Sequence, residues 1–255
     1  MRAGGAEMAV FRLDGDASEQ ASLLIWAHGW GHTHRALLPL AESLRRVAPS
    51  VLLDFPGFGE SPLPPEPWGT ADYADAAAEW LAGLGATRRI WIGHSFGTRV
   101  GLQLAARHPD AVQGLFLIAA AGLPPQRSLA AQIRITARRC AFRIARSLTP
   151  EGPGRDRLRE RFGSADYRQA GQMRPILVKA VSENLTDVAR AVRCPTVLVY
   201  GENDRETPPD IGERLQGLIP KAQLHVLRGF DHWNVLTDGQ HQLTHRLSDF
   251  LERLS

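Results

Sequence analysis

The sequence predicts an α/β fold with a mostly parallel, doubly wound sheet and a small helical insertion. Short apolar runs alternate with stretches of helical periodicity, which is typical of βαβ units. Most of the runs are apolar at every position, as expected of strands that helices cover on both faces. The predicted strands are residues 9–13, 23–27, 51–54, 90–92, 115–119, 196–200 and 223–227.

Five amphipathic stretches between these runs are predicted to be helices. The third should end at His108, because the residue before a proline avoids helical dihedral angles. The predicted helices are residues 35–46, 71–84, 97–107, 209–218 and 240–254.

The alternation breaks between residues 123 and 194, where no strand is evident. This segment opens with Pro124-Pro125 and contains helix-like stretches at 128–147, 155–162 and 173–184. We therefore predict that residues 1–122 and 195–255 form an α/β core and that residues 123–194 form a helical insertion over the sheet. The insertion is rich in arginine, which we interpret as a solvated surface in preference to an attraction for anionic substrates.

Composition narrows the class of protein. A chain of 255 residues suits one large domain or a core with an insertion. The net charge of +3 is too small to predict a nucleic-acid partner. Cys140 and Cys194 have no paired or metal-ligand spacing, which favours a reduced compartment. The first residues lack a signal-peptide core and no apolar run could cross a bilayer, so we expect a cytoplasmic protein with no membrane partner.

A nucleophile is predicted in Gly93-His94-Ser95-Phe96-Gly97, directly after the apolar run 90–92. Gly-x-Ser-x-Gly between a strand and a helix is typical of a sharp turn that exposes the serine hydroxyl. Glycine on either side allows the turn to be tight, and the following helix N-terminus favours developing negative charge. Ser95 is therefore the predicted nucleophile, with a structural serine on a turn as the alternative.

A serine hydroxyl needs a base to accept its proton and an acid to orient that base. His232 follows the last predicted strand and is the predicted base. Asp204 lies just beyond the strand predicted at 196–200 and is the predicted acid. Both residues, like Ser95, follow the carboxyl ends of predicted strands, where open α/β sheets place their ligands.

Other histidines and carboxylates are alternatives to this assignment. His28 and His94 lie within motifs and suit structural roles, while His32 and His34 have no motif support. Asp231 adjoins the histidine on the same loop, and neighbours on a loop rarely face one another. The alternatives are His28, His32, His34 and His94 for the base, and Glu202, Glu206 and Asp231 for the acid.

Backbone amides are the expected donors to an oxyanion. One is the N–H of Phe96, directly after the nucleophile, and the other is that of Trp30 in the loop after the strand 23–27. Trp30, Phe58, Phe96 and Trp233 all lie on loops beside the predicted site, and we predict that they bind substrate. The alternative is that these rings only shield the loops from water.

The chain resembles the α/β-hydrolase fold family along nearly its full length. Five motifs support this resemblance in the family's order, and the segment 123–194 lies where the family inserts a helical cap. The part before residue 23 is shorter than the family's opening strands, so one strand is in doubt. The motifs are His28-Gly29-Trp30, Asp54-Phe55-Pro56-Gly57-Phe58-Gly59-Glu60-Ser61, Gly93-His94-Ser95-Phe96-Gly97, Gly201-Glu202-Asn203-Asp204 with Pro208, and Gly229-Phe230-Asp231-His232.

The resemblance implies a serine hydrolase that cleaves a small carboxylic ester through an acyl-enzyme. Amides and thioesters remain open, as do carbon–carbon bond hydrolysis, lyase chemistry and acyl transfer on the same triad, and a non-catalytic ligand-binding protein. Serine at position 95 argues against relatives that use an aspartate nucleophile. No metal-ligand spacing or phosphate-binding loop is present, so we predict a small-molecule substrate without a metal or other cofactor. The oligomeric state is left open.

Overall fold

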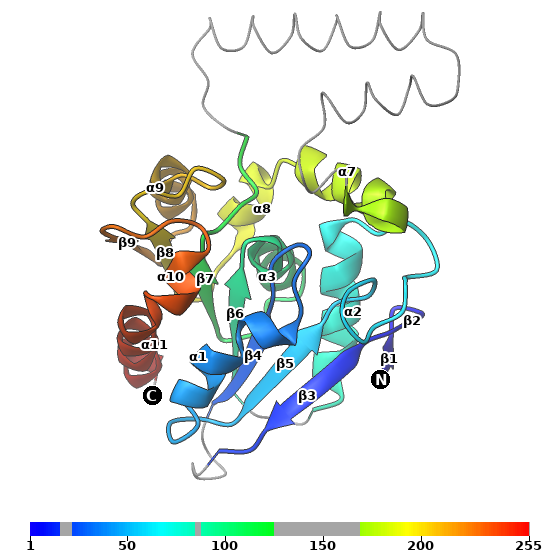
Figure 1. Ribbon diagram of the computed structural model, residues 1–255, viewed down its shortest axis with the longest axis horizontal. Coiled ribbons are helices and arrows are strands. Elements are labelled where there is room, and N and C mark those ends of the chain that lie inside the picture. The colour runs from blue at the N-terminus through cyan, green and yellow to red at the C-terminus, as the bar shows by residue number, and fades with distance from the viewer. Residues whose placement is uncertain (16–21, 85–87, 125–168, 255) are drawn as a thin grey trace, which may run out of the picture. The chain divides into compact units, whose positions relative to one another are not determined.

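A computed structural model describes residues 1–15, 22–84, 88–124 and 169–254 (Figure 1). The chain forms two compact units, one of Met1–Leu123 with Lys179–Ser255 and the other of Pro124–Val178. The helical stretches predicted at 128–147 and 155–162, together with Cys140, lie outside the described residues.

A seven-stranded sheet runs through the first unit in the order β3-β5-β4-β6-β7-β8-β9. All neighbouring strands are parallel except β3, which pairs antiparallel with β5 at one edge. The predicted mostly parallel sheet is confirmed, and each of the seven predicted strands lies within two residues of its observed ends. The strands are β3 (Ala9–Leu13), β4 (Leu23–Ala27), β5 (Ser50–Asp54), β6 (Arg89–His94), β7 (Gly114–Ile118), β8 (Thr196–Gly201) and β9 (Ala222–Leu227).

The opening segment supplies β3 to the sheet and also forms a hairpin that was not predicted. Its strands β1 (Arg2–Ala3) and β2 (Ala6–Glu7) pair antiparallel around Gly4-Gly5. Both glycines have positive φ, 59° and 77°, which suits the tight turn of a two-residue hairpin. Two-residue strands are too short to show an alternating pattern in the sequence.

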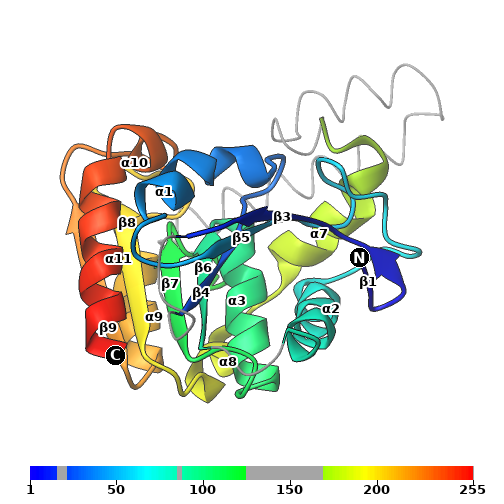
Figure 2. The same cartoon turned by 90° about the horizontal axis from the view of Figure 1, so that it is seen from below.

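Helices cover both faces of the sheet (Figure 2). One face carries α2 (Thr70–Ala82), α3 (Phe96–Arg107), α8 (Thr186–Ala191) and α9 (Pro209–Leu218). The other carries α1 (Leu38–Ser43), α10 (Asn234–Thr237) and α11 (Gln240–Leu254). Because both faces are covered, the central strands β6 and β7 are buried along almost their whole length.

Helix prediction was accurate for the long elements and for residues 174–182, wrong for the continuous helix predicted at 35–46, and it missed two short helices. The helix predicted at 35–46 is instead a 3-10 turn, η1 (His34–Ala36), followed by the six-residue α1, which begins beside Pro39. A proline suits the first turn of a helix and cannot continue one that began earlier. The stretch predicted at 173–184 is η2 (Gly171–Met173) and α7 (Arg174–Ser182), while α8 and α10 were not predicted.

The core beneath α1 and α11 consists of buried aromatic and aliphatic side chains. Trp26 and Phe116 lie on the strands, and Leu243 and Leu247 face them from α11. Burial of each such side chain stabilises the fold by about 2 kcal/mol before the entropy of ordering is counted. None of the helices within the described ranges combines the length and the apolar character needed to cross a lipid bilayer.

Candidate active site

Ser95 forms the turn between β6 and α3. Its backbone has φ 48° and ψ −105°, a region that residues with a Cβ rarely adopt. Its N–H donates to the carbonyl of Ile118 on the neighbouring strand at 3.1 Å. A Cβ on Gly97 would run into the carbonyl oxygen of Ala27, so the turn requires glycine after the serine. The predicted sharp turn therefore exists, and its backbone is strained.

This strain gives a stability prediction. We expect Ser95→Gly to raise the free energy of unfolding by about 1 kcal/mol relative to Ser95→Ala, since glycine adopts positive φ without a Cβ penalty. Urea denaturation of the two variants measures the difference. Both lack the hydroxyl, so the comparison isolates the backbone, and equal midpoints would contradict the assignment of strain.

The loop after β4 packs against this turn. The N–H of Gly97 donates to the carbonyl of His28 at 3.1 Å. A Cβ on Gly29 would stand 3.4 Å from the Cβ of Ser95 and 2.8 Å from Nδ1 of His94, so the loop backbone approaches the serine closely. In the part of the chain that is described, the N–H groups of Trp30 and Phe96 take part in no hydrogen bond. Both amides thus suit the oxyanion role predicted for them.

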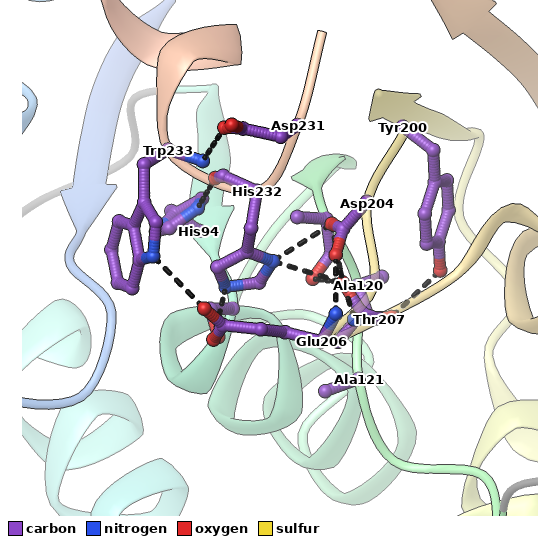
Figure 3. Close-up of polar contacts among 12 residues, drawn as sticks. His94, Ala120, Ala121, Tyr200, Asp204, Glu206, Thr207, Asp231, His232 and Trp233 are labelled. Atoms are coloured by element: carbon purple, nitrogen blue, oxygen red, sulfur yellow. Dashed lines mark hydrogen bonds and ion pairs between the residues drawn. The ribbon is translucent and has the colours of Figure 1, made fainter. Parts of the chain in front are cut away.

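His232 and Asp204 form a buried pair (Figure 3). His232 Nδ1 lies 2.7 Å from Oδ2 of Asp204, and the side chains are 3% and 0% exposed. Asp204 follows β8 and His232 lies in the loop between β9 and α10. The parallel pairing of β8 with β9 brings these two loops to the same edge of the sheet.

The carboxylate of Asp204 is held on both oxygens. Oδ1 accepts the N–H groups of Glu206 at 2.9 Å and Thr207 at 2.8 Å, and Oδ2 accepts the Thr207 hydroxyl at 2.9 Å. Burial alone raises the pKa of Asp204, but the hydrogen bond and charge of His232, with the donors of Thr207, lower it on balance. Asp204 is therefore a fixed anion beside the imidazole.

Thr207 was missed by the sequence reasoning. Its hydroxyl lies 2.9 Å from Asp204 Oδ2, 3.2 Å from His232 Nδ1 and 3.1 Å from the carbonyl of Ala119. A side chain in this place positions both members of the pair. The available signal was a hydroxyl residue three positions after the predicted acid, which by itself is weak.

The other ring nitrogen of His232 has no hydrogen-bond partner in the described residues. Oε2 of Glu206 lies 3.6 Å from this Nε2, and Oε1 of Glu206 accepts the indole N–H of Trp233 at 2.9 Å.

Two alternatives for the acid have other contacts. Glu202 accepts the N–H of Gly229, and Asp231 accepts those of Trp233 and Asn234.

Three of the alternative histidines have contacts of their own, and one of these, His94 Nε2, lies 3.1 Å from the backbone carbonyl of His232. His28 Nε2 accepts the N–H of Phe55, and its Nδ1 lies 2.7 Å from the carbonyl of Gly29. His34 pairs with Asp54 at 3.0 Å. Burial lowers the pKa of His28 to about 4. Burial, and then the charge of His232, lowers the pKa of His94 to about 3. His28 and His94 are consequently neutral at pH 7.

These lowered pKa values predict acid sensitivity. In the unfolded chain the His94 side chain becomes protonated near pH 6.5, whereas in the folded protein it stays neutral down to its lowered pKa. The free energy of unfolding therefore falls as the pH drops from 6.5 towards the folded pKa. We expect the titration of His94 alone to lower the free energy of unfolding by about 2 kcal/mol between pH 7.5 and pH 5. His94→Gln, which does not titrate, should remove that share of the pH dependence in urea titrations.

The exposed His241 gives the matched control, His241→Gln. An unchanged pH dependence in His94→Gln, or the same change in His241→Gln, would contradict the explanation by burial.

The structure brings three of the four predicted substrate-binding rings together. The rings of Trp30, Phe58 and Phe96 lie 4.9 to 6.0 Å apart between centroids. Phe58 and Phe96 are buried, so much of their surface packs within the protein. Trp233 is 39% exposed and packs instead with the rings of His232 and His32.

No group of three or more histidine, cysteine, aspartate or glutamate side chains within the described ranges is arranged to hold a metal ion.

Residues 24–244 match the model of the alpha/beta hydrolase family. The chain belongs to the alpha/beta hydrolase family. A pimeloyl-[acyl-carrier protein] methyl ester esterase of Chromobacterium violaceum is 28% identical, over 90% of this chain and 94% of that protein. A 2-hydroxymuconate semialdehyde hydrolase of Pseudomonas putida is 28% identical, over 76% of this chain and 72% of that hydrolase. The enol-lactonase of Burkholderia xenovorans shares the fold, with a TM-score of 0.74, 20% identity and 98% coverage of both chains.

Proposed function

We propose that this alpha/beta hydrolase cleaves a small carboxylic ester through an acyl-enzyme formed on Ser95. The observation that carries the proposal is the buried Asp204–His232 pair. Nε2 of His232 makes no hydrogen bond to the described residues. A base held by an acid, with its other nitrogen available, is the arrangement that activates a serine hydroxyl.

In the proposed reaction, Ser95 Oγ attacks the ester carbonyl and His232 Nε2 accepts its proton. Asp204 holds His232 with the remaining proton on Nδ1 and stabilises the imidazolium that forms. The N–H groups of Trp30 and Phe96 bind the oxyanion. His232 then returns the proton to the departing alcohol and activates the water that hydrolyses the acyl-enzyme.

The relatives support two reaction types. The methyl ester esterase favours ester cleavage. The 2-hydroxymuconate semialdehyde hydrolase favours carbon–carbon bond hydrolysis on the same three residues, which we retain as the second candidate. An activated serine and an oxyanion site suit both reactions, because each places negative charge on a carbonyl oxygen.

The test combines a covalent probe with a substrate panel. Wild-type protein should be labelled at Ser95 by a fluorophosphonate and should hydrolyse short-chain p-nitrophenyl esters. Labelling without turnover of esters of any chain length, together with cleavage of a vinylogous 1,5-diketone, would favour carbon–carbon hydrolysis. Absence of labelling would contradict both candidates.

A further inference from the structure

Two side chains that the proposed mechanism leaves unused lie beside the proton-transferring nitrogen of His232 (Figure 3). Oε2 of Glu206 is 3.6 Å from Nε2, and Oε1 accepts the Trp233 indole N–H at 2.9 Å. The Glu206 side chain is 53% exposed, and Trp233 is 39% exposed. A carboxylate and an aromatic ring are thus both accessible to solvent next to the reacting atom.

The loops that orient the triad also position this pair. The N–H of Glu206 donates to Oδ1 of Asp204, so the carboxylate and the acid share one turn. Trp233 directly follows His232, and its N–H donates to Oδ1 of Asp231 at 2.9 Å. The ring of His32 packs 4.6 Å from the indole at an angle of 31°. The indole N–H bond then directs the Glu206 carboxylate towards Nε2.

Because Glu206 and Trp233 lie next to Nε2 of His232, they should contact the leaving-group part of the substrate. In acyl transfer the imidazolium donates its Nε2 proton to the leaving group, so that group must pass beside Glu206. No lysine or arginine within the described ranges forms an ion pair with Glu206, so its negative charge is not neutralised there.

We propose that Glu206 and Trp233 form a leaving-group subsite that favours a positively charged alcohol, such as an amino alcohol or an alkylammonium alcohol. This inference rests on the proposed function and deepens it. A carboxylate attracts such a cation, and an aromatic ring binds ammonium groups. The same charge disfavours an ester whose leaving group is anionic.

Two phosphonothioate probes test the subsite without requiring that any ester be a substrate. One carries thiocholine as leaving group and the other carries its neutral isostere, 3,3-dimethylbutanethiol. In each case Ser95 Oγ forms a bond to phosphorus and the phosphorus–sulfur bond breaks. The serine proton passes through His232 to the thiolate. The rate of thiol release gives the labelling rate constant.

Wild-type protein should react about three to ten times faster with the cationic probe, as expected for two well-solvated charges roughly 6 Å apart at an effective dielectric constant between about 40 and about 80. Glu206→Gln should bring the ratio of the two rates close to one. A change in the basicity or position of His232 caused by the substitution would alter both labelling rates alike, so it cancels in the ratio of the cationic to the neutral probe. Glu213→Gln, an exposed change on α9, should retain the wild-type ratio. Added salt should lower the preference in wild type, because it screens exposed charges.

The outcomes separate this inference from the proposed function. The same ratio in wild type and Glu206→Gln overturns the leaving-group subsite. Labelling of Ser95 by a fluorophosphonate, with no reaction of either phosphonothioate, also overturns the subsite while the nucleophile assignment stands. Failure of the fluorophosphonate itself overturns the proposed function, and the subsite assignment falls with it.

Discussion

Ser95→Ala is expected to lose all fluorophosphonate labelling and to lower ester turnover roughly 10⁴-fold or more. The hydroxyl oxygen of Ser95 forms the covalent bond in the proposed reaction, and alanine has no group that replaces it. Alanine keeps the Cβ, so the fold and its strained turn are retained. Mass spectrometry of the labelled protein and steady-state kinetics measure the two effects, and circular dichroism checks that the variant is folded.

Ser43→Ala is the matched control for this experiment. Ser43 is an exposed serine at the end of α1, and its hydroxyl bonds to the carbonyl of Leu40. It should leave labelling and turnover at wild-type levels. Equal labelling of wild type and Ser95→Ala would show that another nucleophile reacts, and the assignment of Ser95 would then be wrong.

Asp204→Asn is expected to lower kcat roughly 10⁴-fold with little change in KM. Oδ1 of Asp204 accepts two backbone N–H groups, from Glu206 and Thr207. The amide oxygen of asparagine should take that place, which directs its NH₂ towards Nδ1 of His232. Nδ1 would then accept a hydrogen bond and the ring proton would move to Nε2. A base protonated on Nε2 cannot accept the proton of Ser95.

Asp210→Asn, in the first turn of α9, makes the same chemical change outside the site. Steady-state kinetics on the best p-nitrophenyl ester should show wild-type kcat for this control. Near-wild-type kcat in Asp204→Asn would mean that a different carboxylate orients His232. A higher KM with unchanged kcat would point instead to a role for Asp204 in substrate binding.

The sheet was predictable because buried parallel strands leave a strong pattern. Runs such as 115–119 are apolar at every position, since helices cover both faces of β7. The short elements β1, β2, α8 and α10 could not be predicted, because two to six residues are too few to show a period. The split of the helix predicted at 35–46 depends on one proline within an otherwise helical pattern.

The sequence by itself determined the order and the chemical types of the site residues. A serine between two close glycines, an acid after one strand and a histidine after the next can be read from the chain, because each lies in a short local motif. Tertiary structure decided which carboxylate meets which ring nitrogen. Asp204 contacts Nδ1, Glu206 faces Nε2, and Asp231 turns back onto its own loop.

Tertiary structure also decided that Thr207 holds the pair, that Trp233 packs on His232, and that Trp30 packs on Phe96. The contact of Thr207 with His232 joins two loops, and the two residues are 25 positions apart in the sequence. Its distance depends on the register between β8 and β9 and on the turn that follows β8, and a local motif carries no information about either.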